Sequence, residues 1–223
     1  MPAVVSVVVP VFNGVLYLAE CLESLLAQDH PALEIVVVDD GSSDGSADIA
    51  EGFSGTRVLR RAHEGLAATR NAGIRESTGS LIGFCDADDT WKPRKARVQA
   101  DYLETHAECG VVLCRQDTRI EAGVTPPAWL LPDQIRGDLD GVSPTSGLFR
   151  REVLEQLGGF TTTMDMGTDF NLLVRARAAG IGIALIEESL RVRRIHDNNM
   201  TTRLGDAKAD MFRTVREHVR RRS

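Results

Sequence analysis

VVSVVVPV, at residues 4–11, is the stretch that decides the fold of this chain of 223 residues. Apart from Ser6 and Pro10, the run consists of valine alone. A strand that is covered by helices on both faces is apolar along its whole length, whereas a strand with one wet face alternates between apolar and polar residues. The run therefore predicts a strand in the middle of a sheet.

On the C-terminal side of this run, helical and strand patterns alternate. Residues 15–28 space their leucines as an amphipathic helix does. Further strands are expected at 34–38, 57–61 and 81–85, and further helices at 47–52 and 65–77. Such alternation predicts an α/β fold with a mainly parallel, doubly wound sheet and helices on both faces, whose ligands bind outside the carboxyl ends of the strands.

The second half of the chain departs from simple alternation. Its patterns predict helices at 93–106, 151–157 and 167–179, a strand at 110–120, two strands within 181–195, and a terminal helix from 203. Residues 121–146 carry several Gly and Pro and are expected to form a long loop, which in a compact domain is usually functional or disordered.

Composition and charge exclude several classes of protein. No run approaches the roughly 18 apolar residues of a membrane span, and the N-terminus has no secretory signal pattern, so we expect a cytoplasmic protein. The net charge of -6 argues against nucleic acid as the main partner, because phosphate backbones require a basic face. The basic residues 213–223 favour a solvated terminal helix, with peripheral contact to an anionic membrane surface as the alternative. The four cysteines form no CxxC pair, which favours free buried thiols over disulfides or zinc ligands.

The run LIGFCDADD, at residues 81–89, ends in three carboxylates, Asp86, Asp88 and Asp89. In an extended backbone Asp86 and Asp88 project to the same side. Oxygen ligands at that spacing suit Mg²⁺ or Mn²⁺, and a divalent ion there would hold a diphosphate and neutralise its charge. The alternative is an acidic turn in which Asp89 or Thr90 starts the next helix.

A second acidic pair, Asp39 and Asp40, follows the strand expected at 34–38. Because the carboxyl ends of parallel strands lie at one edge of the sheet, both acidic groups are expected there. Their coincidence favours a nucleotide site over two unrelated turns.

Four parts of the chain carry a family resemblance, in order and with matching spacing. They are VSVVVPVFNG at 5–14, IVVVDDGSSDGS at 35–46, EGLAATRNAGIRESTGSLIGFCDADD at 64–89, and GLFRREVLEQLGGF at 147–160 continued by GTDFNLLVRARAAG at 167–180. They resemble a family-2 glycosyltransferase of the GT-A fold, up to about His196. The resemblance implies a Rossmann-like sheet and inverting transfer of a sugar from a nucleotide-diphosphate donor to a hydroxyl or amine, with Mn²⁺ or Mg²⁺.

The resemblance also implies how the chain is organised. We expect a single domain, with a nucleotide-sugar-binding half at 1–106, an acceptor-binding and catalytic half at 107–202, and a C-terminal helix at 203–223. The expected donor-binding residues are Pro10, Val11, Asn13, Asp39, Asp40, Arg70, Asn71, Asp86 and Asp89. The expected metal ligands are Asp88, Asp86 and His196.

Individual roles follow from the family pattern, each beside a structural alternative. Asp40, or Asp39 beside it, would accept a hydrogen bond from the nucleobase; the alternative is that Asp40 is a turn residue before Gly41. Arg70 would reach the diphosphate, with a surface salt bridge as the competing role. Pro10 and Val11 would line the base and ribose, or simply end the strand.

Catalysis by inversion needs a base, and Asp169 occupies the position of the family's catalytic aspartate. Its alternative is a helix-start aspartate favoured by the helix dipole. Thr168 stands where many members carry an acidic residue, and Asn171 where another Asp is frequent, which puts acceptor recognition in question more than chemistry. Asp165 is a possible substitute for the missing charge. Trp129 and Thr168 are the expected acceptor contacts, and Arg193 or Arg194 would add positive charge.

The acceptor is expected to be a glycan, a lipid-linked molecule or a small molecule. Two other functions stay open. A nucleotidyltransferase acting on a sugar phosphate would carry a Gly-rich, basic loop after its first strand, and VFNGVLYLAE does not provide one. A catalytically silent nucleotide-sugar-binding module is suggested only by Thr168 and Asn171.

Overall fold

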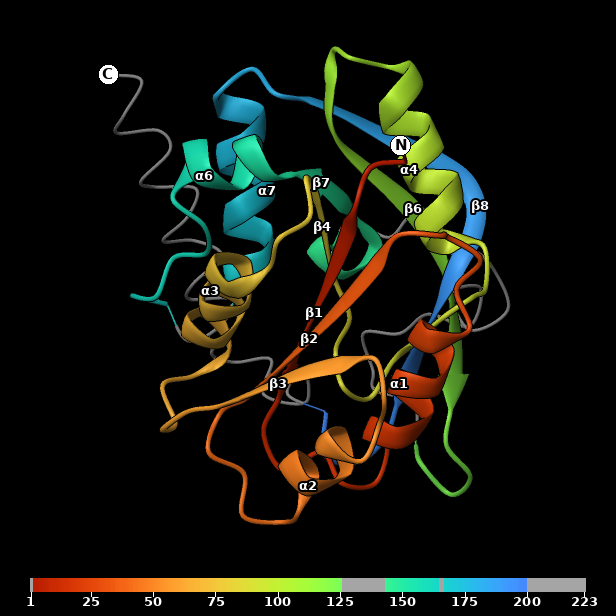
Figure 1. Ribbon diagram of the computed structural model, residues 1–223, viewed down its shortest axis with the longest axis vertical. Helices are drawn as coiled ribbons and strands as arrows, with labels where there is room; N and C mark the ends of the chain where they lie inside the picture. The colour runs from red at the N-terminus through yellow and green to blue at the C-terminus, as the bar shows by residue number, and fades with distance from the viewer. Residues whose placement is uncertain (1, 126–142, 165–166, 200–223) are drawn as a thin grey trace.

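The computed structural model describes residues 2–125, 143–164 and 167–199. Within these residues the chain forms one eight-stranded sheet between two layers of helices (Figure 1). The predictions for Trp129, Asp165 and the helix from 203 fall outside the described residues.

The strands occur in the order β3-β2-β1-β4-β7-β6-β8-β5 across the sheet. Their bounds are β1 Val5–Val11, β2 Leu33–Asp39, β3 Thr56–Arg60, β4 Leu81–Phe84, β5 Thr90–Trp91, β6 Cys109–Ile120, β7 Leu148–Arg150 and β8 Gly182–Ile195. The first four are parallel, as are β6 and β8, while β7 runs antiparallel to β4 and β6, and β5 antiparallel to β8. The prediction of a mainly parallel sheet is confirmed.

The helices cover both faces of the sheet, as predicted. Their bounds are α1 Leu18–Leu26, α2 Ser46–Glu51, α3 Leu66–Glu76, α4 Lys95–Thr105, α6 Arg151–Leu157 and α7 Thr168–Ala178, with a short 3₁₀ helix, η1, at Pro144–Ser146. One core joins α1, α2 and α4 to the sheet face that carries Val7 and Val9. The other joins α3, α6 and α7 to the face that carries Val8 (Figure 1).

All seven residues of β1 are buried, which is the environment that the valine run predicts. Helix α3 lies unusually close to this strand. A Cβ atom added at Gly73 would come within 2.2 Å of Val8 Cγ1, so only a glycine permits the observed approach. This contact helps to fix the position of α3, which carries Arg70.

Several local predictions need correction. Residues 182–195 form one strand rather than two, because β8 stays paired with β6 throughout. The pairing crosses one irregularity, where Cys114 of β6 pairs with Ile186 and the next residue, Arg115, pairs with Ser189. Neither Asp89 nor Thr90 starts a helix, since Thr90 begins β5 and α4 starts at Lys95. The short strands β5 and β7 were not predicted.

All four cysteines are free and buried, which confirms their predicted state. Cys21 and Cys85 bring their Sγ atoms to 3.7 Å beneath the acidic loop, in thiol–thiol contact. Among the described residues, no helix combines the length and the apolar character that a membrane crossing requires.

Candidate active site

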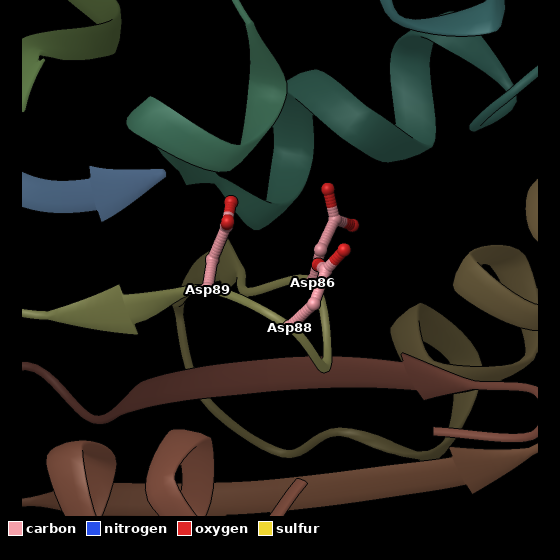
Figure 2. Close-up of side chains that lie close together, drawn as sticks. All are labelled: Asp86, Asp88 and Asp89. Carbon is pink, nitrogen blue, oxygen red and sulfur yellow. The ribbon is translucent and has the colours of Figure 1, made fainter. Parts of the chain in front are cut away.

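The three carboxylates after β4 lie in a turn rather than in an extended segment. The Asp89 amide donates to the Asp86 carbonyl at 3.0 Å, which closes the turn. The side chains of Asp86, Asp88 and Asp89 nevertheless project to the same side of the chain (Figure 2), and one oxygen from each carboxylate lies within 4.8 Å of the other two. The expected convergence is therefore present, but the turn produces it and strand alternation does not.

Asp89 fastens the acidic loop to β8 through hydrogen bonds. Its Oδ2 accepts a hydrogen bond from Arg191 at 2.6 Å, and its Oδ1 accepts one from the Arg194 amide at 2.9 Å. The side chain is buried. Burial raises the pKa of Asp89, Arg191 lowers it, and the neighbouring charges of Asp88 and Asp86 raise it further. Because both of its oxygens already have partners, Asp89 is the least available of the three carboxylates for a donor or metal.

Asp86 and Asp88 are each about one-third exposed, with side-chain exposures of 35% and 30%. Asp86 uses Oδ1 to accept from Arg70 at 2.8 Å. Asp88 uses Oδ2 to accept from His196 Nε2 and from Asn199, both at 3.0 Å. Within the part of the chain that the structure describes, the remaining oxygens, Asp86 Oδ2 and Asp88 Oδ1, have no hydrogen-bond partner. Two hard oxygen donors are thus left for a cation of the Mg²⁺ or Mn²⁺ type.

His196 lies at the acidic loop as predicted, and its ring packs against Tyr17 with the ring centres 4.6 Å apart. Its Nδ1 accepts from the Asn198 amide at 3.2 Å, which assigns the proton to Nε2. In that tautomer Nε2 donates to Asp88 and presents no lone pair to a metal. In this geometry His196 orients Asp88, and its role as a metal ligand stays a prediction.

Arg70 is neither a surface salt bridge nor a group pointing into open space. Its side chain is only 1% exposed and makes ion pairs with Asp86 at one side and Asp169 at the other. Burial alone would lower the pKa of Arg70, but the charges of Asp169 and Asp86 outweigh it and raise the pKa. The guanidinium is therefore a permanent positive bridge between the acidic loop and α7.

Asn71, expected to bind the donor, is occupied elsewhere. Its Nδ2 donates to the Phe160 carbonyl and its Oδ1 accepts from the Phe160 amide, each at 2.8 Å. The same Phe160 ring lies under the Arg70 guanidinium, 5.1 Å from its centre. Asn71 thus fixes the aromatic platform of Arg70, a structural role that the sequence did not indicate.

Asp169 lies in the first turn of α7, one-third exposed, with 33% of its side chain accessible. Its Oδ1 accepts from Arg70, and its Oδ2 accepts from Ser143 at 3.2 Å. The helix start also favours a carboxylate at this position, which is the structural alternative to the predicted role as a base. Thr168 is buried beside it, with its Oγ1 3.5 Å from Asp169 Oδ1.

At the end of β2 the two aspartates have different tasks. Asp40 is used by the loop before α3, since its two oxygens accept from the amides of Glu64 at 2.8 Å and Gly65 at 2.9 Å. Asp39 accepts only long hydrogen bonds, of 3.3 and 3.4 Å, from the Ser42 amide. Asp39 therefore keeps more acceptor capacity than Asp40, the residue that the sequence favours as the nucleobase contact.

The segment after β1 is tied to the loop after β2. Asn13, in the left-handed region with a φ of 52°, accepts from the Ser43 amide at its Oδ1 at 2.9 Å, and its own amide donates to Ser42 Oγ at the same distance. Pro10 and Val11 are buried in β1, so their side chains are core residues.

Residues 6–158 match the family model for glycosyl transferase family 2. The chain belongs to glycosyl transferase family 2. It is 34% identical over 169 residues to an uncharacterized glycosyltransferase of Nostoc sp., covering 69% of this chain and 52% of that relative. It is also 40% identical over 105 residues to glycosyltransferase GlyA of Streptococcus pneumoniae, covering 45% of this chain and 14% of GlyA. The chain thus spans about half, or less, of the length of these relatives.

Two solved structures share the fold of this family-2 chain. Residues 1–349 of Staphylococcus aureus TarS, solved in complex with UDP-GlcNAc, superpose with a TM-score of 0.73 at 21% identity, covering 90% of this chain and 61% of that TarS fragment. The mannosyltransferase PcManGT of Pyrobaculum calidifontis, solved with GDP-Man and Mn²⁺, gives a TM-score of 0.71 at 23% identity, covering 96% and 65%. These likenesses confirm the expected GT-A fold.

Several site residues of this family-2 chain escaped sequence reasoning. Ser143 and Thr145 carried no signal because they lie within the long loop expected at 121–146. Arg191, which holds Asp89, lies in a basic run where only Arg193 and Arg194 were singled out. Strand alternation was the signal that could have found it, since Arg191 and Arg193 share one face of β8.

The two arginines that were singled out differ in their tasks. Arg194 pairs its two terminal guanidinium nitrogens with Glu20 and Glu121, and its Nε donates to the backbone carbonyl of Asp88 at 3.0 Å rather than to a loop carboxylate. Arg193 is mostly buried, and burial together with the nearby charge of Arg191 lowers its pKa, while the charges of the three loop carboxylates raise it. Of the two, Arg193 is therefore the one whose charge interacts with all three loop carboxylates.

Proposed function

We propose that this chain is an inverting glycosyltransferase that moves a sugar from a nucleotide-diphosphate donor to an acceptor hydroxyl, with metal assistance and Asp169 as general base. One observation carries the proposal. Arg70 contacts Asp86 with one side of its guanidinium and Asp169 with the other, so the acidic loop after β4 and the start of α7 form one site. Family membership supplies the reaction type, and the arrangement supplies the groups for it.

The donor is proposed to lie along the carboxyl edge of β2, β1 and β4. Asp39 is the better-placed acceptor for a nucleobase N–H, because its oxygens are the less engaged of the two acidic residues there. TarS was solved with UDP-GlcNAc and PcManGT with GDP-Man, which supports a nucleotide sugar as the donor class. A thermal-shift screen of nucleotide sugars identifies the base and sugar of this chain's own donor.

The metal is proposed to bind at Asp86 Oδ2 and Asp88 Oδ1, with His196 and Asn199 holding Asp88 in orientation. A divalent ion bound there would supply positive charge to the diphosphate as it departs. Arg193 is proposed to add to that charge from β8, since its position exposes it to the same carboxylates. The Mn²⁺ in the PcManGT structure supports a divalent cation in this role.

The chemical step is a single displacement. The acceptor oxygen attacks the anomeric carbon, its proton passes to the Asp169 carboxylate, and the bond from that carbon to the diphosphate oxygen breaks with its electron pair. Arg70 and Ser143 hold the two oxygens of Asp169, which fixes the direction in which the carboxylate faces the acceptor. Thr168 is proposed to line the acceptor side, and the acceptor to be a glycan, a lipid-linked molecule or a small molecule.

The test compares the wild type with Asp169→Asn. A thermal-shift screen of UDP- and GDP-sugars with Mn²⁺ first identifies a donor, since a ligand that binds only the native state raises the melting temperature. Asp169→Asn should keep the nucleotide affinity and lose donor turnover by about a hundredfold or more, the range of general-base catalysis. Asp101→Asn, an exposed aspartate on α4, is the matched control. Wild-type turnover in Asp169→Asn would refute the base, and release of inorganic diphosphate would indicate a nucleotidyltransferase instead.

A further inference from the structure

Lys95 is a fully buried charge that the proposed mechanism does not use. It is the first residue of α4 and has an exposed fraction of 0%. Its Nζ donates to Gln99 Oε1 at 2.5 Å and to the Ser146 carbonyl at 3.2 Å, and it lies 4.0 Å from the centre of the Trp91 ring. Within residues 2–125, 143–164 and 167–199, no carboxylate lies within ion-pairing distance of it.

Two physical penalties act against a lysine at this position. Removing an ammonium from water without a counter-ion is expensive, and well-packed apolar residues often serve such a position better. A positive charge at a helix N-terminus is also opposed by the helix dipole. A residue that only filled space would avoid both penalties, so the direction of the hydrogen bonds of Lys95 is informative.

These bonds converge on one backbone atom. The Ser146 carbonyl accepts from Lys95 Nζ, from Gln99 Nε2 at 2.8 Å and from Cys114 Sγ at 3.2 Å. A carbonyl oxygen has two lone pairs, so these three donors fill its acceptor capacity from within the protein. Ser146 is the last residue of η1, and its position is therefore set from beneath by α4 and β6.

The other side of this turn reaches the proposed active site. Ser143 Oγ donates to Asp169 Oδ2 at 3.2 Å and lies 2.9 Å from Thr145 Oγ1. Thr145 Oγ1 accepts from Arg191, which in turn donates to Asp89 at 2.6 Å. The turn 143–146 thus joins the proposed base on α7 to the acidic loop after β4, on the side opposite Arg70.

We propose that Lys95 and Gln99 are positioning residues for glycosyl transfer. By clamping the Ser146 carbonyl they hold the turn 143–146, from which Ser143 orients the carboxylate of Asp169 and Thr145 orients Arg191. Neither residue touches the donor or the acceptor. This inference rests on the proposed function, because it gives Lys95 a task in the orientation of the proposed base.

The experiment measures donor turnover, nucleotide binding and amide hydrogen exchange of residues 143–148 in Lys95→Met. Methionine keeps the length of the side chain and removes its charge. We expect kcat to fall about tenfold, in line with the loss of about one oriented hydrogen bond, while the Kd of the nucleoside diphosphate stays within about twofold. Exchange in 143–148 should become faster. Lys92→Met removes a partly exposed lysine that pairs with Asp117, and it should change none of the three.

A double variant separates positioning from general destabilisation. If Lys95 acts through Ser143, then Lys95→Met combined with Ser143→Ala should lower kcat no further than Ser143→Ala alone. Multiplicative losses, an unchanged kcat in Lys95→Met, or equal losses of kcat and nucleotide affinity would overturn the proposal.

The kcat of Gln99→Glu and the amide exchange of residues 143–148 test the proposal independently of the folding of Lys95→Met and of donor turnover. If Lys95→Met does not fold, Gln99→Glu takes its place, since it supplies Lys95 with a counter-charge but removes the N–H that reaches Ser146. It should lower kcat in the same direction, and an unchanged kcat would count against the clamp. If the wild type turns over no donor, the proposed function has failed. The exchange of residues 143–148 then still shows whether Lys95 holds the turn.

Discussion

Replacement of Lys95 by methionine should change how the stability of this protein depends on pH. Burial lowers the pKa of Lys95 from 10.5 to about 8, and the charge of Arg191 on β8 acts in the same direction. Cys114 on β6 and Cys85 after β4 act in the opposite direction. These are the charged and titratable groups that face the ammonium from the neighbouring elements.

The sign and size of the effect of Lys95 on stability follow from the protons that the folded and unfolded states bind. Between about pH 8 and 10.5 the unfolded chain keeps the Lys95 proton and the folded protein releases it. The unfolded state then binds more protons, so the contribution of Lys95 to stability rises with pH through this window. Below about pH 8 the full penalty applies. A difference of about 2.5 pKa units corresponds to about 3 kcal/mol, at about 1.4 kcal/mol per unit.

The assay is urea unfolding of the wild type and of Lys95→Met at several pH values from 7 to 10.5. The substitution also removes the hydrogen bonds of Lys95, which shifts the difference in unfolding free energy by a similar amount at every pH. The informative quantity is therefore the slope of that difference against pH. As the pH rises from 7 to 10.5, the variant should lose about 3 kcal/mol of stability relative to the wild type. Lys92→Met, the same substitution at a partly exposed lysine, is measured in parallel as the control. A pH-independent difference between wild type and Lys95→Met would refute the buried, uncompensated charge.

Three other predictions follow from the site and the fold. Asp88→Ala should abolish Mn²⁺-dependent nucleotide binding, and an unchanged affinity in Mn²⁺ titration calorimetry would contradict its role. Arg70→Lys should lower donor turnover by about tenfold or more with little change in nucleotide affinity, because one ammonium cannot bridge both carboxylates as a planar guanidinium does; full activity in steady-state kinetics would count against the bridge. Gly73→Ala should destabilise the protein by about 1–3 kcal/mol through overpacking against Val8, as measured by urea unfolding. Wild-type stability would show that α3 can move away from β1.

The comparison of sequence and structure is most instructive at the acidic loop. The residues of LIGFCDADD indicate a strand that ends in carboxylates, and the structure confirms that order. Which oxygens of Asp86, Asp88 and Asp89 are already hydrogen-bonded could not be predicted, because each carboxylate is held by a partner far away in the chain. Arg191, for example, lies 102 residues from Asp89. Ser143 and Lys95 were missed for the same reason, since neither has a neighbour in sequence that reveals its contact.

What the amino-acid sequence determined by itself is the alternation of strands and helices, the burial of β1 and the edge of the sheet where the acidic groups lie. These features depend on the spacing of apolar residues over a few turns or strand pairs, which is local information. The tertiary structure alone decided that Arg70 is a buried bridge, that Asp39 keeps more acceptor capacity than Asp40, and that a clamped turn orients Asp169. Those outcomes depend on which hydrogen-bond donors the fold brings to each carboxylate, and donors from distant segments meet only when the sheet and its two helical layers have assembled.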